Sequence, residues 1–150
     1  MSDLRELYQE VILDHSKHPK NYHKIDDASH FAEGFNPLCG DHFNLYLKVE
    51  NGVITDVGFD GAGCAISKAS ASIMTSIVKG KSVEEADKIF RQFHNYVTGK
   101  ADKSFDVESL GKLAVFSGVT EYPVRVKCAT LAWHTLKNAL ENKTEVVTTE

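Results

Sequence analysis

The chain has 150 residues, of which 42% are apolar and 25% are charged, and its formal net charge is −4. This length supports one domain with its own hydrophobic core, and the mildly negative charge gives no support to non-specific binding of nucleic acid. No apolar run is long enough to span a bilayer, and the first ten residues are acidic where a secretory signal needs a basic start. We therefore expect one cytoplasmic domain over residues 1–150 that binds neither nucleic acid nor a membrane.

The first half of the chain is predicted to form one helix and then antiparallel strands. Apolar residues recur at helical spacing over residues 3–15. Residues 43–49 and 53–59 alternate between apolar and polar, and an Asn-Gly pair at 51–52, which is typical of a hairpin turn, joins them. An earlier strand is expected around residues 30–33, so the sheet is predicted to be antiparallel with three strands.

The second half is predicted to be helical. An apolar stripe over residues 66–78 indicates one helix, and a Ser-x-x-Glu capping box starting at Ser82 begins the next. A short helix is expected over residues 110–116, and Pro123 suits the first turn of the last helix. Residues 143–150 are expected to be a frayed tail. Strands followed by helices indicate an α+β fold, a small antiparallel sheet packed by helices.

Three cysteines lie far apart in this sequence. Cys39 is in the loop segment FNPLCGDHF, Cys64 is at a strand-to-helix junction in DGAGCAIS, and Cys128 is in the first two turns of the last helix. Their odd number and a reducing cytoplasm argue against a disulfide framework. Three unrelated buried thiols are one interpretation, but none of the three falls in the middle of a regular strand, where a packing cysteine is expected.

The hairpin also predicts where two of the cysteines meet. If its strands pair across residues 51–52, their outer ends come together, and with them Cys39 and Cys64. Asp41 lies two residues after Cys39, on the same face of an extended chain. Three thiolates and one carboxylate suit the tetrahedral coordination of zinc, although the sequence has no C-x-x-C pair. The pattern therefore indicates a zinc site in which Cys128 completes the set.

Two charge effects are expected near these thiols. Cys64 should have a lowered pKa because it lies at the N-terminus of a helix. Arg125, three residues before Cys128 on the same helix face, either favours the Cys128 thiolate or is a solvent-facing charge. The run GAGCAI begins like a dinucleotide-binding fingerprint, but that motif needs a parallel βαβ unit, so we set this interpretation aside.

Three segments together resemble a known family. NPLCGD, GAGCAIS and YPVRVKCATLAW are similar to the three cysteine segments of the U-type iron–sulfur assembly proteins, the IscU/SufU (NifU N-terminal-like) family. The resemblance runs from the helix LYQEVILDHSKHPKN to the last helix. It implies an α+β fold with a small antiparallel sheet, in agreement with the pattern of the sequence.

Departures from the IscU pattern indicate the SufU branch. Lys127 stands where IscU-type scaffolds have a histidine before the third cysteine. Residues 121–125 read Glu-Tyr-Pro-Val-Arg where IscU has the Leu-Pro-Pro-Val-Lys segment that a dedicated chaperone binds. The segment between the second and third cysteines is also longer than in IscU.

The resemblance to SufU implies a function and its residues. Members of that branch accept persulfide sulfur from a SufS-type, pyridoxal-phosphate-dependent cysteine desulfurase and pass it on to the iron–sulfur assembly machinery, which is a sulfurtransferase activity. The acceptor corresponds to Cys39, Arg125 is implied to assist contact with the partner, and the desulfurase is implied to supply a histidine to the zinc. The zinc ligands fall, motif by motif, on Cys39, Asp41, Cys64 and Cys128.

Other functions remain open at this point. The same four residues could hold a [2Fe–2S] cluster on a scaffold that assembles and transfers it, although Lys127 counts against this. A purely structural zinc site is a further alternative. A cysteine hydrolase would use Cys39 with His42 or His134, but no third group that would orient the base is evident.

Overall fold

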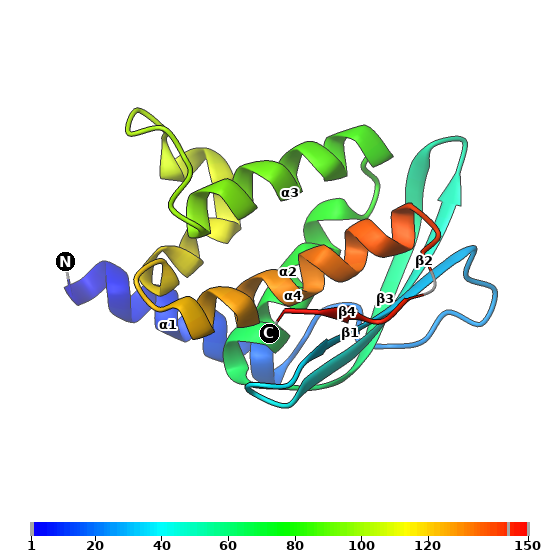
Figure 1. Cartoon of the computed structure of the whole chain (residues 1–150), viewed down its shortest axis with the longest axis horizontal. Coiled ribbons are helices and arrows are strands. Elements are labelled where there is room, and N and C mark those ends of the chain that lie inside the picture. Colours follow the sequence, from blue (N-terminus) through cyan, green and yellow to red (C-terminus); the bar gives the residue numbers. More distant parts are fainter. Residues whose placement is uncertain (1, 144, 150) are drawn as a thin grey trace.

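Figure 1 shows the computed structural model of the chain, which describes residues 2–143 and 145–149, with side chains from residue 4 onward. In chain order the elements are α1 (Ser2–Lys17), β1 (His30–Asn36), β2 (Asp41–Glu50), β3 (Val53–Ala62), α2 (Ala65–Val78), α3 (Val83–Val97), the 3₁₀ segment η1 (Val107–Val119), α4 (Pro123–Leu140) and β4 (Val147–Thr148). The three main strands precede four of the five helical segments, and the predicted α+β class is confirmed. No helix in the described ranges is long and apolar enough to cross a membrane.

The sheet has the strand order β3-β2-β1-β4. β1 pairs with β2 and β2 pairs with β3, both antiparallel. Asn51 and Gly52 form the turn between β2 and β3, and both have positive φ, which gives a two-residue turn the twist of the strands it joins. The predicted hairpin and the earlier strand are therefore confirmed, and β1 extends as far as Asn36.

A fourth strand makes the prediction of three strands wrong. β4 pairs in parallel with β1, with Val147 opposite Gly34. The prediction of a frayed tail over residues 143–150 is therefore wrong for β4, while residues 144 and 150 lie outside the described part of the chain. β1 would otherwise leave one row of backbone groups unpaired, and a strand of two residues has no periodicity that the sequence could reveal.

Helices cover one face of the sheet. Along β2 every second side chain is buried toward them, namely Phe43, Leu45 and Leu47. α4 packs on β1 and β2, α2 packs on β3, and α3 lies farther from the sheet against α4 and η1 (Figure 1). Trp133 of α4 is fully buried in this layer, so α4 joins the sheet to the outer helices.

Local signals set the helix ends. The Ser82 side chain accepts a hydrogen bond from the backbone N–H of Glu85, and the Glu85 side chain accepts one from the Ser82 N–H, so the predicted capping box is confirmed. Pro123 is the first residue of α4, as predicted. The helix expected over residues 110–116 lies within the longer η1 segment, which Gly111 interrupts with a φ of +60°.

Candidate metal centre

Three segments that are distant in sequence meet at one end of the sheet. The turn at residues 37–40 joins β1 to β2, and the pairing of His42 with Ala62 brings the β3–α2 junction beside it. The first turns of α4 carry the third cysteine to the same place, where its sulfur contacts that of Cys39. The strand pairing therefore brings Cys39 and Cys64 to one end of the hairpin, as the turn predicted.

Cys39, Asp41 and Cys128 form one cluster of potential ligands. A thiol or carboxylate atom of each lies within 4.8 Å of the others. The Cys128 Sγ lies 3.2 Å from the Cys39 Sγ. Asp41 and Cys128 are buried, whereas Cys39 is exposed in its turn. The cluster thus has a buried side and one thiol that faces solvent.

Cys64 lies beside this cluster rather than within it. It is the N-cap of α2, and its backbone N–H donates to Asp41 Oδ1 at 2.8 Å. Its Sγ lies 4.0 Å from Asp41 Oδ2 and accepts from the backbone N–H of Ser67 at 3.4 Å. The structure therefore brings all four predicted ligands to one place, with Asp41 as the carboxylate that contacts the Cys64 thiol.

A glycine makes room for this carboxylate. A Cβ atom on Gly63 would lie 2.7 Å from Asp41 Oδ1 and 2.6 Å from Ser67 Oγ, which is closer than real Cβ atoms approach other atoms. Asp41 is 0% exposed at the start of β2. Only a residue without a side chain can stand at position 63 while Asp41 keeps this place. The second glycine of the GAGC segment therefore leaves the space that the Asp41 carboxylate occupies.

The donor set fits zinc. A buried carboxylate is costly unless a cation or several hydrogen bonds compensate it. In the described part of the chain, no lysine, arginine or histidine forms an ion pair with Asp41. Thiolate sulfur and carboxylate oxygen are both zinc ligands, and four of them match its tetrahedral preference. A divalent cation would compensate the negative charge that the cluster of Cys39, Asp41 and Cys128 carries when ionised.

The hydrogen bond between the Cys64 and Cys128 thiols shifts their pKa values in opposite directions. The pKa of Cys64 is lowered to about 6, because the Cys128 thiol donates to its thiolate and the hydroxyl and backbone N–H of Ser67 add further hydrogen bonds. The pKa of Cys128 is raised, first by that same bond to Cys64 and then by burial. The direction expected for Cys64 is correct, but a neighbouring thiol, rather than the helix dipole alone, is its leading cause.

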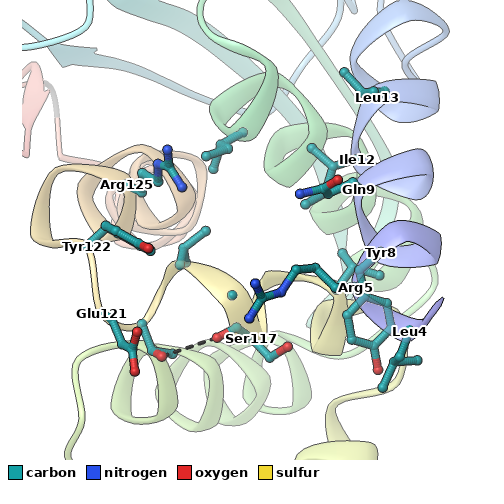
Figure 2. A pocket seen from close by; sticks show the side chains of 15 residues that line it. Leu4, Arg5, Tyr8, Gln9, Ile12, Leu13, Ser117, Glu121, Tyr122 and Arg125 are labelled. Atoms are coloured by element: carbon teal, nitrogen blue, oxygen red, sulfur yellow. Dashed lines mark hydrogen bonds between the residues drawn. The ribbon is translucent and has the colours of Figure 1, made fainter. Parts of the chain in front are cut away.

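Arg125 lies away from these thiols. Its guanidinium stacks over the Tyr122 ring at 4.5 Å, and it is not among the groups that shift the pKa of Cys128. It lines a cavity of about 590 Å³ between α1, η1 and the start of α4. Figure 2 shows Arg5 of α1 reaching into this cavity from the opposite wall. The structure therefore places Arg125 at a neighbouring surface and does not support an effect on the Cys128 thiolate.

The histidines of the hydrolase alternative are engaged elsewhere. His42 follows Asp41 in β2, but strand alternation turns it to the outer face, where it pairs with Glu33. His134 of α4 packs against His94, with ring centres 5.1 Å apart. Neither histidine has a hydrogen bond to Cys39 among the described residues, so a cysteine–histidine pair gains no support.

One residue close to the cluster was not singled out from the sequence. Asn36 is 0% exposed, and its side chain lies between Asp41 and Cys128. Its sequence signals were its place directly after the apolar Phe35, where a turn residue is expected, and its being the first residue of the NPLCGD segment.

A comparison with protein families decides what kind of domain this is. The model of the NifU-like N-terminal domain matches residues 7–129, which include all four predicted ligands. The chain belongs to the NifU-like N-terminal domain family. This family contains the IscU and SufU proteins of iron–sulfur cluster assembly, so the resemblance of the three cysteine segments is confirmed.

Relatives in this family carry two kinds of name. The iron–sulfur cluster assembly scaffold protein IscU of Thermotoga maritima is 44% identical over 135 residues, which are 90% of this chain and 93% of that protein. The zinc-dependent sulfurtransferase SufU of Bacillus subtilis is 40% identical over 140 residues, which are 93% of this chain and 92% of that protein. Both relatives are matched over nearly their whole length.

Solved structures have the same fold. The crystal structure of a putative iron–sulfur cluster assembly scaffold protein for the SUF system from Fervidobacterium islandicum matches with a TM-score of 0.81 and 42% identity, covering 87% of this chain and 94% of that one. A NifU-like N-terminal protein from Brucella abortus matches with a TM-score of 0.80 at 21% identity, which bears on the fold alone.

Proposed function

We propose that this NifU-like domain is a zinc-dependent sulfurtransferase, which accepts persulfide sulfur from a cysteine desulfurase and passes it on for iron–sulfur cluster assembly. The observation that supports this most directly is the exposed Cys39 thiol, 3.2 Å from the buried Cys128 thiol and within one cluster with the buried Asp41. A centre that is closed on one side and has its most exposed thiol, Cys39, in a turn suits transfer between two proteins.

The residues proposed to hold zinc are Cys39, Asp41, Cys64 and Cys128. Zinc, when bound, would keep the cysteines as thiolates at neutral pH without oxidising them. Cys64 caps a helix and Cys128 is buried within one, whereas Cys39 lies in a four-residue turn. Cys39 is therefore the thiol that can leave the cluster with the least disturbance of the fold.

The transfer step uses Cys39 as the nucleophile. Its thiolate attacks the outer sulfur of the persulfide on the desulfurase cysteine, and a new S–S bond forms. The S–S bond of the desulfurase persulfide breaks, its cysteine leaves as a thiolate, and Cys39 now carries the persulfide with its proton. The step is a thiol–persulfide exchange, so it needs no external oxidant or reductant.

The proposed partner is a SufS-type, pyridoxal-phosphate-dependent desulfurase in the cytoplasm. The relative named zinc-dependent sulfurtransferase SufU supports this choice. Arg125, on the same helix as Cys128, and Tyr122, the residue before that helix, are exposed at the rim of the cavity between α1 and α4. We place the contact that assists the desulfurase here, with Arg125 acting on the partner and not on the thiols.

The alternative is a scaffold on which a [2Fe–2S] cluster is assembled. Relatives from Thermotoga maritima and Streptococcus pyogenes that are named as IscU scaffolds favour it. Thiolate and carboxylate ligands suit iron as well as zinc. The two functions differ in what must be present, because sulfur transfer proceeds without iron and cluster assembly does not.

Sulfide release under anaerobic conditions separates these functions. We would mix the zinc-loaded protein with a cysteine desulfurase, cysteine and a thiol reductant, without iron, and measure the rate of sulfide release. Sulfur transfer predicts a strong acceleration that is lost in Cys39→Ala, a variant that removes the acceptor but leaves three ligands in place. No acceleration by the wild type, together with a visible cluster spectrum once iron is added, would favour the scaffold.

A further inference from the structure

The buried side chain of Asn36 is hydrogen-bonded to two of the proposed metal ligands. It ends β1, stands opposite Asp41 in the strand pairing, and has no exposed surface. Its Nδ2 donates to Asp41 Oδ2 at 3.4 Å and to Cys128 Sγ at 3.5 Å. One amide group therefore contacts two of the proposed ligands from the interior of the protein.

Asn36 also fixes the turn that carries the third ligand. The Leu38 backbone N–H donates to the side-chain Oδ1 of Asn36 at 3.2 Å, which is the hydrogen bond of an Asx turn. The Cys39 N–H donates to the backbone carbonyl oxygen of Asn36 at 3.3 Å, which is the hydrogen bond of a β-turn. Because Oδ1 faces a backbone donor, Nδ2 must face the carboxylate and the thiol, which are acceptors when ionised.

We infer that Asn36 is a positioning residue of the metal centre: its Nδ2 holds Asp41 and Cys128 together while its Oδ1 anchors the turn of Cys39. This inference rests on the proposed zinc site. Residues that hydrogen-bond to metal ligands orient them, and their loss typically costs about 10- to 100-fold in metal affinity or activity. Asn36 contacts or anchors three of the four proposed ligands, so its loss is expected to fall in this range.

Asn36→Asp separates the two halves of the side chain. The variant has nearly the same shape and keeps an acceptor for the Leu38 N–H, but it replaces the donor with an oxygen that faces the Asp41 carboxylate. Asn44→Asp is a matched control, because Asn44 of β2 also donates through Nδ2 to a carboxylate on the neighbouring strand, Asp60, at 2.9 Å. Asn36→Ser, whose hydroxyl can make one of these bonds, is a second variant in case Asn36→Asp does not fold.

The readouts are metal binding and the stability of the metal-free protein. We would measure the zinc dissociation constant by competition with a chromophoric chelator, the sulfur-to-cobalt charge-transfer absorbance after cobalt substitution, and the thermal unfolding of each metal-free protein. We expect Asn36→Asp to weaken zinc binding by about 10- to 100-fold and to lower the cobalt absorbance while the metal-free protein still unfolds cooperatively. Asn36→Ser should lie between it and the wild type, and Asn44→Asp should bind as the wild type does.

Each other outcome counts against the inference. Wild-type zinc affinity and cobalt absorbance in Asn36→Asp would overturn it, and so would tighter zinc binding, because the new carboxylate would then serve as a ligand without any donor. An equal loss of zinc affinity in Asn44→Asp would show that added negative charge alone causes the effect. A wild-type protein that binds neither zinc nor cobalt would overturn the proposed function as well, which distinguishes that failure from the failure of Asn36 alone.

Discussion

Asp41 keeps its place because of the residue that stands against it. Its carboxylate occupies the space in which a side chain at position 63 would begin, with 2.7 Å between Oδ1 and a Cβ built on Gly63. The same carboxylate accepts the backbone N–H of Cys64 at 2.8 Å. The short sequence between β3 and α2 therefore supplies one proposed ligand, Cys64, and positions another, Asp41.

Gly63→Ala should disturb the metal centre more than the fold. The added methyl group forces both the Asp41 carboxylate and the Ser67 hydroxyl to move, because neither can remain at its present distance. We expect zinc affinity to fall by about tenfold or more, as when a group that orients a metal ligand is lost. Zinc competition on the purified protein would measure this.

Gly118→Ala is the matched control for that variant. A Cβ at position 118 would meet no atom within 4 Å, so the same substitution there adds a methyl group to open space. An affinity in Gly63→Ala equal to that in Gly118→Ala would contradict the proposed role of Asp41 in holding zinc.

Between elements, α3 and α4 meet through a group of aromatic rings. Phe90 of α3 packs edge-on against His134 of α4 at 5.3 Å between ring centres, and His94 packs against the same histidine at 5.1 Å. Burial, together with the nearby His94 and Lys137, lowers the pKa of His134 to about 4. The imidazole is therefore neutral in the folded protein at neutral pH.

This contact predicts a loss of stability in acid. The ordinary pKa of His134 is 6.5. Below that pH the histidine is protonated in the unfolded chain, whereas in the folded protein it stays neutral down to about pH 4. The free energy of unfolding should therefore fall as the pH drops from 6.5 to 4, by on the order of 2 kcal/mol after allowing for solvent at the partly exposed ring. His134→Phe should flatten this part of the pH profile.

Thermal unfolding of the zinc-free protein at several pH values would measure this pH dependence of stability, since acid release of metal then makes no contribution. His18→Phe, at an exposed histidine after α1, serves as the control and should keep the wild-type slope. Parallel profiles for His134→Phe and the wild type would contradict the assignment.

Sequence patterns predicted the elements that repeat a local period and missed those that depend on distant partners. The hairpin, the capping box at Ser82 and the start of α4 at Pro123 follow from a few adjacent residues, and each is confirmed. β4 was missed because its two residues are defined only by the edge of β1. Asn36 was missed because its contact with Cys128 joins residues 92 apart in the chain.

In the candidate site, too, local patterns were predicted and contacts with distant partners were missed. The cysteines and Asp41 were indicated by residue type, turn position and family resemblance, and the structure brings them together. Arg125 was expected beside Cys128 from helix spacing, but the cation–π contact with Tyr122 holds it at the neighbouring cavity. Helix spacing gives the face on which a side chain begins and does not give the partner that its far end contacts.

In the whole molecule, the proposed centre is where separate parts of the chain are joined. Three segments meet there: the β1–β2 turn, the β3–α2 junction and the start of α4. They contact one another through thiols and a carboxylate, which repel one another once ionised. A bound cation would convert this repulsion into a link between the sheet and two helices. The exposed thiol of that link is the group we expect to meet another protein.

The most direct measurement is the position of the transferred sulfur. We would incubate the zinc-loaded protein anaerobically with a cysteine desulfurase and cysteine, trap persulfides with an alkylating reagent, and map them by mass spectrometry of the peptides. We predict one added sulfur on the peptide of Cys39, and none on any peptide of Cys39→Ala. A persulfide that forms first on Cys64 or Cys128, or one that forms as readily in Cys39→Ala, would contradict sulfur acceptance at Cys39.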